Sequence, residues 1–228
     1  MSPTEDSCNG LRILLIGPYP PPFGGIATHL RALAPGLSAM GAEDIAIVSF
    51  ESKDATQDMD GFKIYRFNLK RQGWQVLNPI GWSVLVRTLR VLIPHRLRPS
   101  ALIRECLKAL IVHQLAARHG SNVVSFYQSN SSIALLPLSR IWGRKRSIVL
   151  TVFGEIYDSA SSAFMTEYRR LFKDILAAPV AVTASSRHCA RSVAAIGVTR
   201  AIEPVYYGVD LDGVVSVDLR SSFRETHR

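Results

Sequence analysis

The chain contains 228 residues, 47% of them hydrophobic, and carries a formal net charge of +9 at neutral pH. This length and composition favour one large globular domain or two small ones, and they exclude a largely disordered chain. No apolar run approaches the roughly 18 residues that a transmembrane helix needs. The polar start of the chain, with Glu5 and Asp6, lacks the apolar core of a signal peptide. We therefore expect a cytoplasmic protein.

The three cysteines, Cys8, Cys106 and Cys189, lie far apart in the sequence. None of them belongs to a C-x-x-C pair, so the sequence predicts neither a zinc site nor a disulfide framework. We expect these cysteines to be small buried or incidental thiols, and we expect the protein to hold no metal.

The first fifty residues predict a strand, a helix and a second strand. Leu11–Gly17 is a short apolar run typical of a buried parallel strand. The prolines of the next loop, Pro18–Gly25, exclude helix and sheet there. Apolar residues then recur at helical spacing over Ile26–Met40, and the strand Ile45–Phe50 follows. Together these segments indicate a βαβ unit.

The alternation of strands and helices continues to the end of the chain. We expect further strands at Phe62–Phe67, which is a candidate for the sheet edge, and at Val123–Tyr127, Ser147–Val152, Val180–Thr183 and Ala201–Val205. We expect helices at Trp82–Ile93, Ser100–His119, Ser131–Ile141, Ala163–Ala177 and Ser186–Ile196. This α/β pattern predicts a Rossmann-like, doubly wound parallel sheet of about seven strands.

Ligands of such sheets bind at the carboxyl ends of the strands, where we expect the loops Gly17–Gly25, Gln128–Ser131 and Phe153–Asp158. In the first loop, Gly24 and Gly25 have no side chains, so a ligand can approach the backbone closely. The helix that follows offers unpaired N–H groups and the positive end of its dipole to a phosphate or a sugar hydroxyl. The alternative is a rigid turn that needs two glycines. The spacing fits neither a nicotinamide-binding loop nor a Walker A loop.

The stretch Leu11–Phe50 resembles the opening of family 4 glycosyltransferases of the GT-B fold. Those proteins begin with an apolar strand, a Pro-rich Gly-Gly loop and a helix with a histidine near its start, and Gly24, Gly25 and His29 match that pattern. The resemblance implies that the loop lies at a cleft between two Rossmann-like domains, near donor phosphate and acceptor. It makes Tyr19, Gly24, Gly25, Thr28 and His29 candidate binding residues.

The segment Thr151–Asp158 extends the resemblance, because family members often end this strand in Thr-x-His-Gly. Thr151 and Gly154 match, and Phe153 occupies the histidine position. In the family that histidine contacts the donor sugar, so Phe153 is a candidate for stacking on a sugar ring. Gly154 and Glu155 complete the predicted site, and Glu155 is also our candidate catalytic carboxylate. The alternative places Phe153 in the core and Glu155 at the cap of the next turn.

A third segment, Val182–His188, resembles the family's strand-end Val-x-Ser before a helix. Ser185 or Ser186 would be a good N-cap residue there. The alternative is that these serines do nothing more than cap the helix.

The end of the chain resembles the family's Asn-Gly-Val-Asp signature, which marks the hinge into a C-terminal domain. Gly208, Val209 and Asp210 match, and Tyr207 stands at the asparagine position. We therefore expect a polar tail at 1–10, an acceptor-side Rossmann-like domain at 11–205, and a hinge with the start of a C-terminal domain at 206–228.

The resemblance implies a retaining glycosyltransferase that moves a hexose from a nucleotide sugar to a glycan, polysaccharide or lipid-linked acceptor, without cofactor or metal. In the family the donor side, with its Glu-x7-Glu motif, belongs to the C-terminal domain, which would act in cis or in trans. A truncated or degenerate chain that works as a non-catalytic module, binding a glycan, a membrane or a partner protein, is the main alternative. A nucleotide-sugar epimerase is a lesser one.

The positive charge is concentrated between Phe62 and Arg118, where eleven Lys and Arg residues accompany one acid, Glu105. A localised basic patch of this kind indicates an acidic partner. We expect one apolar helical face and an arginine rim, listed here in that order: Trp82, Leu85, Val86, Leu89, Leu92, Ile93; Arg87, Arg90, Arg96, Arg98.

Such a helix can lie on an anionic membrane, which would make the protein peripheral on the inner face. The alternative is an amphipathic helix packed on the sheet with a solvated basic face. Aromatic residues are sparse and nucleic-acid-binding motifs are lacking, so we expect no nucleic-acid partner.

Overall fold

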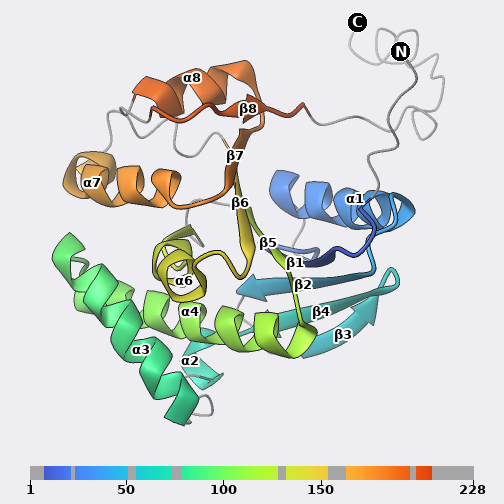
Figure 1. The fold of residues 1–228 in the computed structure, drawn as a ribbon, viewed down its shortest axis with the longest axis horizontal. Helices are drawn as coiled ribbons and strands as arrows, with labels where there is room; N and C mark the ends of the chain where they lie inside the picture. Colours follow the sequence, from blue (N-terminus) through green and yellow to red (C-terminus); the bar gives the residue numbers. More distant parts are fainter. Residues whose placement is uncertain are drawn as a thin grey trace, which may run out of the picture.

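The computed structural model describes residues 8–21, 24–50, 55–72, 79–127, 132–153, 163–195 and 199–206. Within these residues the strands form one sheet in the order β3-β4-β2-β1-β5-β6-β7-β8 (Figure 1). Neighbouring strands are parallel except for β3 and β4, which pair antiparallel. The strand order reverses between β1 and β5, and this switch point is where α/β sheets bind ligands.

Apolar residues dominate the strands at the centre of the sheet, as expected for strands buried on both faces. These central strands are β1 (Arg12–Ile16), β2 (Asp44–Phe50), β5 (Val123–Tyr127) and β6 (Ser147–Val152). The outer strands are β3 (Ala55–Met59), β4 (Phe62–Phe67), β7 (Ala181–Ala184) and β8 (Glu203–Pro204).

The helices lie on both faces of the sheet, and successive strand residues supply two separate cores (Figure 1). Ile13 and Leu15 of β1 pack with α1 (Gly25–Ala39), while Leu14 and Ile16 belong to the larger core on the opposite face. The helices of that core are α4 (Pro99–His119), α6 (Leu135–Trp142) and α7 (Ala163–Ala177).

The remaining helices each add few residues to that core, such as Leu92 of α3 and Val193 of α8. Helix α3 (Pro79–Leu92) packs on α4 and α6, and the short helix η1 (Ile93–His95) continues it toward α4. Helix α2 (Leu69–Gln72) contacts α4, and α8 (Arg187–Ala195) packs beside β7 and β8. No helix within the described ranges has both the length and the apolar character needed to cross a bilayer.

Helix α4 contains an ion-pair cluster around one buried carboxylate, and a separate hydrogen bond joins it to α6. Glu105 is fully buried, and its Oε1 accepts hydrogen bonds from Lys108 Nζ at 3.0 Å and from Arg104 Nε at 3.1 Å. Trp142 Nε1 of α6 donates to His113 Nδ1 at 2.9 Å. Burial, and secondarily the charge of Arg146, lowers the pKa of His113, so this imidazole is neutral at pH 7 and can accept that bond.

The α/β fold class and its doubly wound parallel sheet are confirmed, with one strand more than expected. The extra strand is β3, a polar segment whose exposed side chains give no apolar alternation. Because β3 forms the edge, the prediction that Phe62–Phe67 lies there was wrong. The two strands are joined by Asp60 and Gly61, whose φ values of 53° and 80° are typical of a two-residue hairpin turn.

Several helix and strand boundaries also differ from the predicted ones. Helix α3 begins at Pro79, because proline suits the first turn of a helix. Helix α6 begins at Leu135, so that Pro137 falls in the first turn, where a missing N–H is tolerated. The last strand is reduced to Glu203–Pro204. Ser186 caps α8 as predicted, since its Oγ accepts from the N–H of Cys189 at 3.1 Å.

Candidate functional site

The candidate site lies at the carboxyl ends of β1, β5 and β6, which are neighbours in the sheet. The loop Gly17–Gly25 leaves β1 there and leads into α1, Tyr127 is the last residue of β5, and Phe153 follows β6 directly. Positions 22–23 of this loop, and positions 128–131 and 154–158 of the other predicted loops, lie outside the described residues. These include the predicted site residues Gly154 and Glu155.

Three aromatic rings from separate elements meet at this edge. The ring centroids of His29 and Tyr127 are 5.8 Å apart, those of His29 and Phe153 6.2 Å, and those of Tyr127 and Phe153 6.3 Å. His29 and Phe153 are half-buried, whereas Tyr127 is almost completely buried. His29 and Phe153 therefore present two half-buried rings at this edge, and the buried ring of Tyr127 lies next to both.

Desolvation sets the protonation of two of these groups. Burial lowers the pKa of His29, so its imidazole is neutral at pH 7 and can both donate and accept a hydrogen bond. Burial also raises the pKa of Tyr127, against the opposing effect of hydrogen bonds with Ser125 and Thr151. The surface is thus uncharged at neutral pH, which suits a neutral sugar ring better than an ion.

The glycines of the loop serve two different purposes. A Cβ atom at Gly17 would lie 2.7 Å from Leu30 Cδ1 and 3.0 Å from the carbonyl oxygen of Tyr127, so this position needs glycine for packing. A Cβ at Gly24 or Gly25 would meet nothing within 4 Å, and neither residue has a positive φ. The alternative of a turn that requires glycine at 24 and 25 therefore finds no support in the described residues.

Helix α1 presents its amino end beside these glycines. Gly24 is the N-cap residue, no side-chain hydrogen bond caps the helix, and its first turn contains no acidic residue. The first-turn N–H groups and the helix dipole together favour an anionic or hydroxyl ligand at this position. Thr28, one turn into the helix, is exposed on the same end. Backbone donors, two open glycines and an apolar ring surface are thus adjacent.

Tyr19 is the one predicted binding residue in the described loop that the structure places elsewhere. Its side chain is 0% exposed, and its hydroxyl donates to Asp60 Oδ2 at 3.1 Å. A sequence pattern shows that a loop contains a tyrosine but not which way the ring turns. Tyr19 therefore supports the loop from inside and does not form its binding surface.

The predicted basic surface on α3 is present, but its apolar face differs from the expected one. Leu92 is buried, and Leu85 and Leu89 are half-buried, whereas Trp82 is 54% and Ile93 58% exposed. The prediction of one continuous apolar face was wrong, because α3 packs on α4 and α6 and turns Val84, Thr88 and Leu92 inward.

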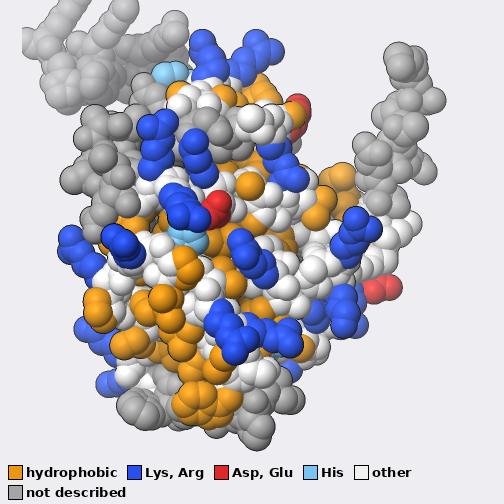
Figure 2. Space-filling view, turned by 60° about the vertical axis from the view of Figure 1, so that its left-hand side comes forward, with side chains coloured by type: hydrophobic (Ala, Val, Ile, Leu, Met, Phe, Trp, Pro, Cys, Tyr) orange, Lys and Arg blue, Asp and Glu red, His pale blue; other side chains and the backbone are white. Residues whose placement is uncertain are grey.

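The outward side of α3 forms what we call the α3 surface, made of exposed apolar residues and a rim of exposed arginines. Its members are Trp82, Val86, Ile93 and Ile103, with Arg87, Arg90, Arg96, Arg98 and Arg104. Figure 2 shows hydrophobic side chains gathered on the lower part of this face and bordered by Lys and Arg. Between 79 and 104 the sequence contains no acidic residue.

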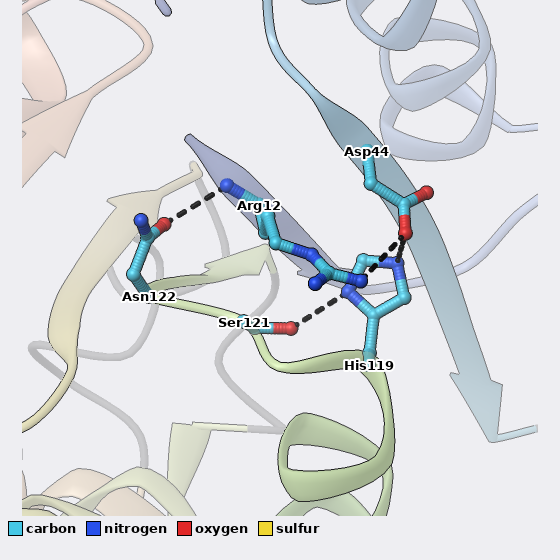
Figure 3. A network of polar contacts seen from close by, with 5 residues as sticks. All are labelled: Arg12, Asp44, His119, Ser121 and Asn122. Atoms are coloured by element: carbon cyan, nitrogen blue, oxygen red, sulfur yellow. Dashed lines mark hydrogen bonds and ion pairs between the residues drawn. The ribbon is translucent and has the colours of Figure 1, made fainter. Parts of the chain in front are cut away.

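A polar network at the opposite, amino edge of the sheet has a structural explanation (Figure 3). His119 Nε2 lies 3.0 Å from Asp44 Oδ2, His119 Nδ1 lies 2.9 Å from Ser121 Oγ, and Arg12 Nη2 pairs with the same carboxylate at 3.4 Å. A pocket of about 380 Å³ lies beside it. Ser121 is buried, so it cannot serve as a nucleophile, and the network ties the end of α4 to β1 and β2.

Comparison with known proteins decides the family. The sequence model described as "Glycosyl transferase 4-like domain" matches residues 24–208. The chain belongs to this family. The resemblance to family 4 glycosyltransferases is thereby confirmed over residues 24–208, a range that begins at Gly24. A search of curated proteins found no match.

Solved structures show the same fold at low sequence identity. Anabaena Alr3699/HepE in complex with UDP and glucose is similar, with a TM-score of 0.53 and 13% identity over 95% of this chain. The apo form of the lipopolysaccharide outer core galactosyltransferase WaaB matches with a TM-score of 0.55 and 12% identity over 87% of this chain. The chain covers only 50% and 46% of those proteins, respectively. Both are GT-B glycosyltransferases, and they confirm the fold class of this domain.

The sequence did not single out Tyr127, or two residues that bond to the loop before α1. These are Asp60, which accepts from the Tyr19 hydroxyl, and Arg66, which donates to the carbonyl oxygen of Tyr19. Tyr127 could have been found, because it ends a predicted strand at the ligand-binding edge. The turn at Asp60 could also have been predicted, since Asp-Gly between two strands indicates a hairpin. The buried role of Arg66 could not have been predicted, because a basic residue within an outer strand is normally solvated.

Proposed function

We propose that this domain forms the acceptor-side half of a glycosyltransferase that moves a hexose from a nucleotide sugar to a glycan or lipid-linked acceptor with retention of configuration. The observation that carries the proposal is the pair of open glycines, Gly24 and Gly25, beside the rings of His29 and Phe153. A phosphate or hydroxyl would contact the backbone at the glycines. A sugar ring would stack its C–H face on Phe153.

Family membership and the neighbours' length support a two-domain enzyme. The similar structures are about twice as long as this chain, and one of them holds UDP and glucose. We propose that 206–228 leads into a second domain that carries the donor side, and that Glu155 is the catalytic carboxylate of this half. Transfer depends on that second domain, because a departing nucleoside diphosphate needs electrostatic stabilisation.

Saturation-transfer NMR on this chain tests the sugar site. The probes are UDP-glucose, UDP-galactose and the methyl glycosides of glucose and galactose. We expect transfer to the ring protons of at least one probe, and we expect Phe153→Ala to abolish it. Trp82→Ala is the matched control, because it removes an exposed aromatic ring from another surface.

Two results would contradict the proposal: no transfer to any probe, or transfer that Phe153→Ala leaves unchanged. Binding of the methyl glycosides without any turnover by protein that includes the second domain would favour the non-catalytic module. Where turnover is observed, the coupling constant of the product's anomeric proton reports whether configuration is retained.

A second proposal concerns the α3 surface, which we propose binds an anionic membrane. Charge complementarity favours this partner, since Arg87, Arg90, Arg96 and Arg98 are exposed on the same segment as Trp82, Val86 and Ile93. The nearest acids are Glu105, which pairs with Arg104, and Asp174, which lies 3.6 Å from His95. An amphipathic surface of this kind lies in the headgroup layer, with its apolar residues inserted and its arginines on the phosphates. It would hold the sugar site close to a lipid-linked acceptor.

Flotation with vesicles of phosphatidylcholine alone or mixed with phosphatidylglycerol tests this partner. Each arginine near an anionic surface contributes about 1 kcal/mol, so Arg87→Gln with Arg90→Gln should weaken binding by about 2 kcal/mol, or roughly 30-fold. Arg187→Gln with Arg191→Gln is the matched control on α8, which lies at the other end of the molecule (Figure 1). Equal flotation of the two double variants, or of both vesicle types, would refute the proposal.

A further inference from the structure

The described first part of the Gly17–Gly25 loop, residues 17–21, is attached to the β3–β4 hairpin through a buried arginine. Arg66 of β4 is 6% exposed, and its Nη1 donates to the carbonyl oxygens of Tyr19 and Pro21, each at 2.9 Å. Its Nη2 donates to the carbonyl oxygen of Pro20. One guanidinium therefore binds three consecutive carbonyls of the loop.

The chemistry of the loop explains why an arginine is placed there. Proline lacks an N–H group, so a Pro-rich segment cannot join a regular backbone ladder, yet its buried carbonyls still require donors. A buried guanidinium requires acceptors in turn, because an unpaired buried charge is strongly unfavourable. Arginine has five donors in a planar fork, whereas lysine is a single point charge, so lysine would satisfy this set of carbonyls less well.

A second contact joins the same loop to the turn of the hairpin. The hydroxyl of Tyr19 donates to Asp60 Oδ2 at 3.1 Å, and Arg31 Nε of α1 lies 3.0 Å from the same oxygen. Burial, followed by the hydrogen bond to Asp60, raises the pKa of Tyr19 to about 12, so the hydroxyl keeps its proton and remains a donor. Asp60 thus connects the beginning of the loop and the helix that follows it.

We propose that Arg66 and Asp60 are positioning residues, which fix the loop from behind and so set where Gly24 and Gly25 face the ligand. This inference rests on the proposed sugar site. Neither residue would touch the sugar, since Arg66 is buried and both act through the loop or α1. A loop fixed before binding loses little freedom on binding, which favours affinity.

The test combines the amide NMR signals of the loop with sugar binding in four variants of the full chain. Arg66→Met removes the guanidinium, and Arg66→Lys keeps the charge. Tyr19→Phe removes one hydroxyl. Asp60→Asn removes the carboxylate charge, and asparagine, like aspartate, tolerates the positive φ of the turn. Lys63→Met is the matched control, because it removes an exposed cation from the same strand. The readouts are the amide signals of Tyr19, Gly24 and Gly25, and saturation transfer to the sugar that wild type binds best.

We expect Arg66→Met to shift or broaden the loop signals and to weaken sugar binding about tenfold, because misplaced contact groups lose binding energy. Arg66→Lys should restore part of both effects. Tyr19→Phe and Asp60→Asn should shift the same signals with an affinity loss of about threefold, and they keep the test valid if Arg66→Met does not fold. Lys63→Met should change neither readout.

The outcomes separate this inference from the proposed function. Loop signals that stay in place in the folded Arg66, Tyr19 and Asp60 variants would overturn the positioning role, whether or not sugar binds. Displaced loop signals with unchanged affinity would overturn it as well, while leaving the sugar site intact. Absence of sugar binding by the wild-type chain would overturn the proposed site, and with it the effect on affinity, even if the loop moves.

Discussion

Replacing Gly25 with alanine adds one methyl group at the start of α1. Among the described residues, apart from its chain neighbours and the backbone of its own helix, that methyl group meets no atom within 4 Å. The change should therefore not disturb the fold. Alanine is favoured over glycine in helices because glycine loses more backbone entropy on folding. We expect Gly25→Ala to leave the free energy of unfolding unchanged or to raise it slightly. In the proposed site, however, the same methyl group occupies the space that a ligand would fill.

Gly36→Ala provides the matched control, because Gly36 lies in the same helix and a Cβ there also meets nothing within 4 Å. An interior glycine-to-alanine change stabilises a helix by about 0.5–1 kcal/mol. For a domain of this size that raises Tm by roughly 1–4 °C. Gly25→Ala should raise Tm by less, because Gly25 is the first helical residue and is less constrained.

The two variants should differ in sugar binding. If the methyl group of Gly25→Ala displaces the ligand from the backbone, we expect affinity to fall about tenfold, which corresponds to about 1.4 kcal/mol. Gly36→Ala should bind like wild type. The assay is a titration by saturation-transfer NMR, with Tm measured on the same samples. If Gly25→Ala binds sugar with wild-type affinity, the ligand does not contact this glycine. If Gly25→Ala markedly lowers Tm, the fold itself requires glycine at this position.

Three further predictions concern stability. Gly17→Ala should destabilise the domain by about 1–3 kcal/mol, because its Cβ would overlap the side chain of Leu30, and thermal denaturation measures the loss. Folding lowers the pKa of His113, so the unfolded chain binds that proton more tightly and stability falls as pH drops below about 6.5. The drop in Tm from pH 7.5 to pH 5.5 should accordingly be smaller for His113→Gln than for wild type, and an equal drop in both proteins would contradict the role of His113. Glu105→Ala should cost about 3–5 kcal/mol in urea denaturation, because it leaves Lys108 buried without its carboxylate; a loss below 1 kcal/mol would count against a buried ion pair.

Much of the fold was predictable because buried segments have a local apolar pattern in the sequence. The central strands are apolar along their whole length, and α1 shows a helical stripe that includes Leu30 and Leu33. Strand β3 has no such apolar pattern, because its residues are mostly exposed. Its backbone pairing with β4 holds it in the sheet. The outward face of α3 was mispredicted for a related reason. Helical spacing identifies residues on one side, but it does not identify which side a neighbouring helix covers.

The candidate site was predictable to the extent that it follows from strand order. His29 and Phe153 were expected at the carboxyl edge, and the structure brings their rings to 6.2 Å. The role of Tyr19 was not predictable, because it depends on Asp60, which lies 41 residues away. Contacts over such distances are set by the packed fold and leave no periodic pattern near either residue.

The link between Arg66 and the loop spans 47 residues and joins the proposed sugar site to the β3–β4 hairpin, whose outer strand is an edge of the sheet. Edge hairpins have a free side, so their length and turn can change without disturbing the central strands. A change in the β3–β4 hairpin can therefore shift the loop while every residue of the loop stays the same. In the proposed glycosyltransferase, two relatives with identical glycine loops would thus differ in acceptor preference through their hairpins, and sugar selectivity would be open to engineering at positions that do not touch the sugar.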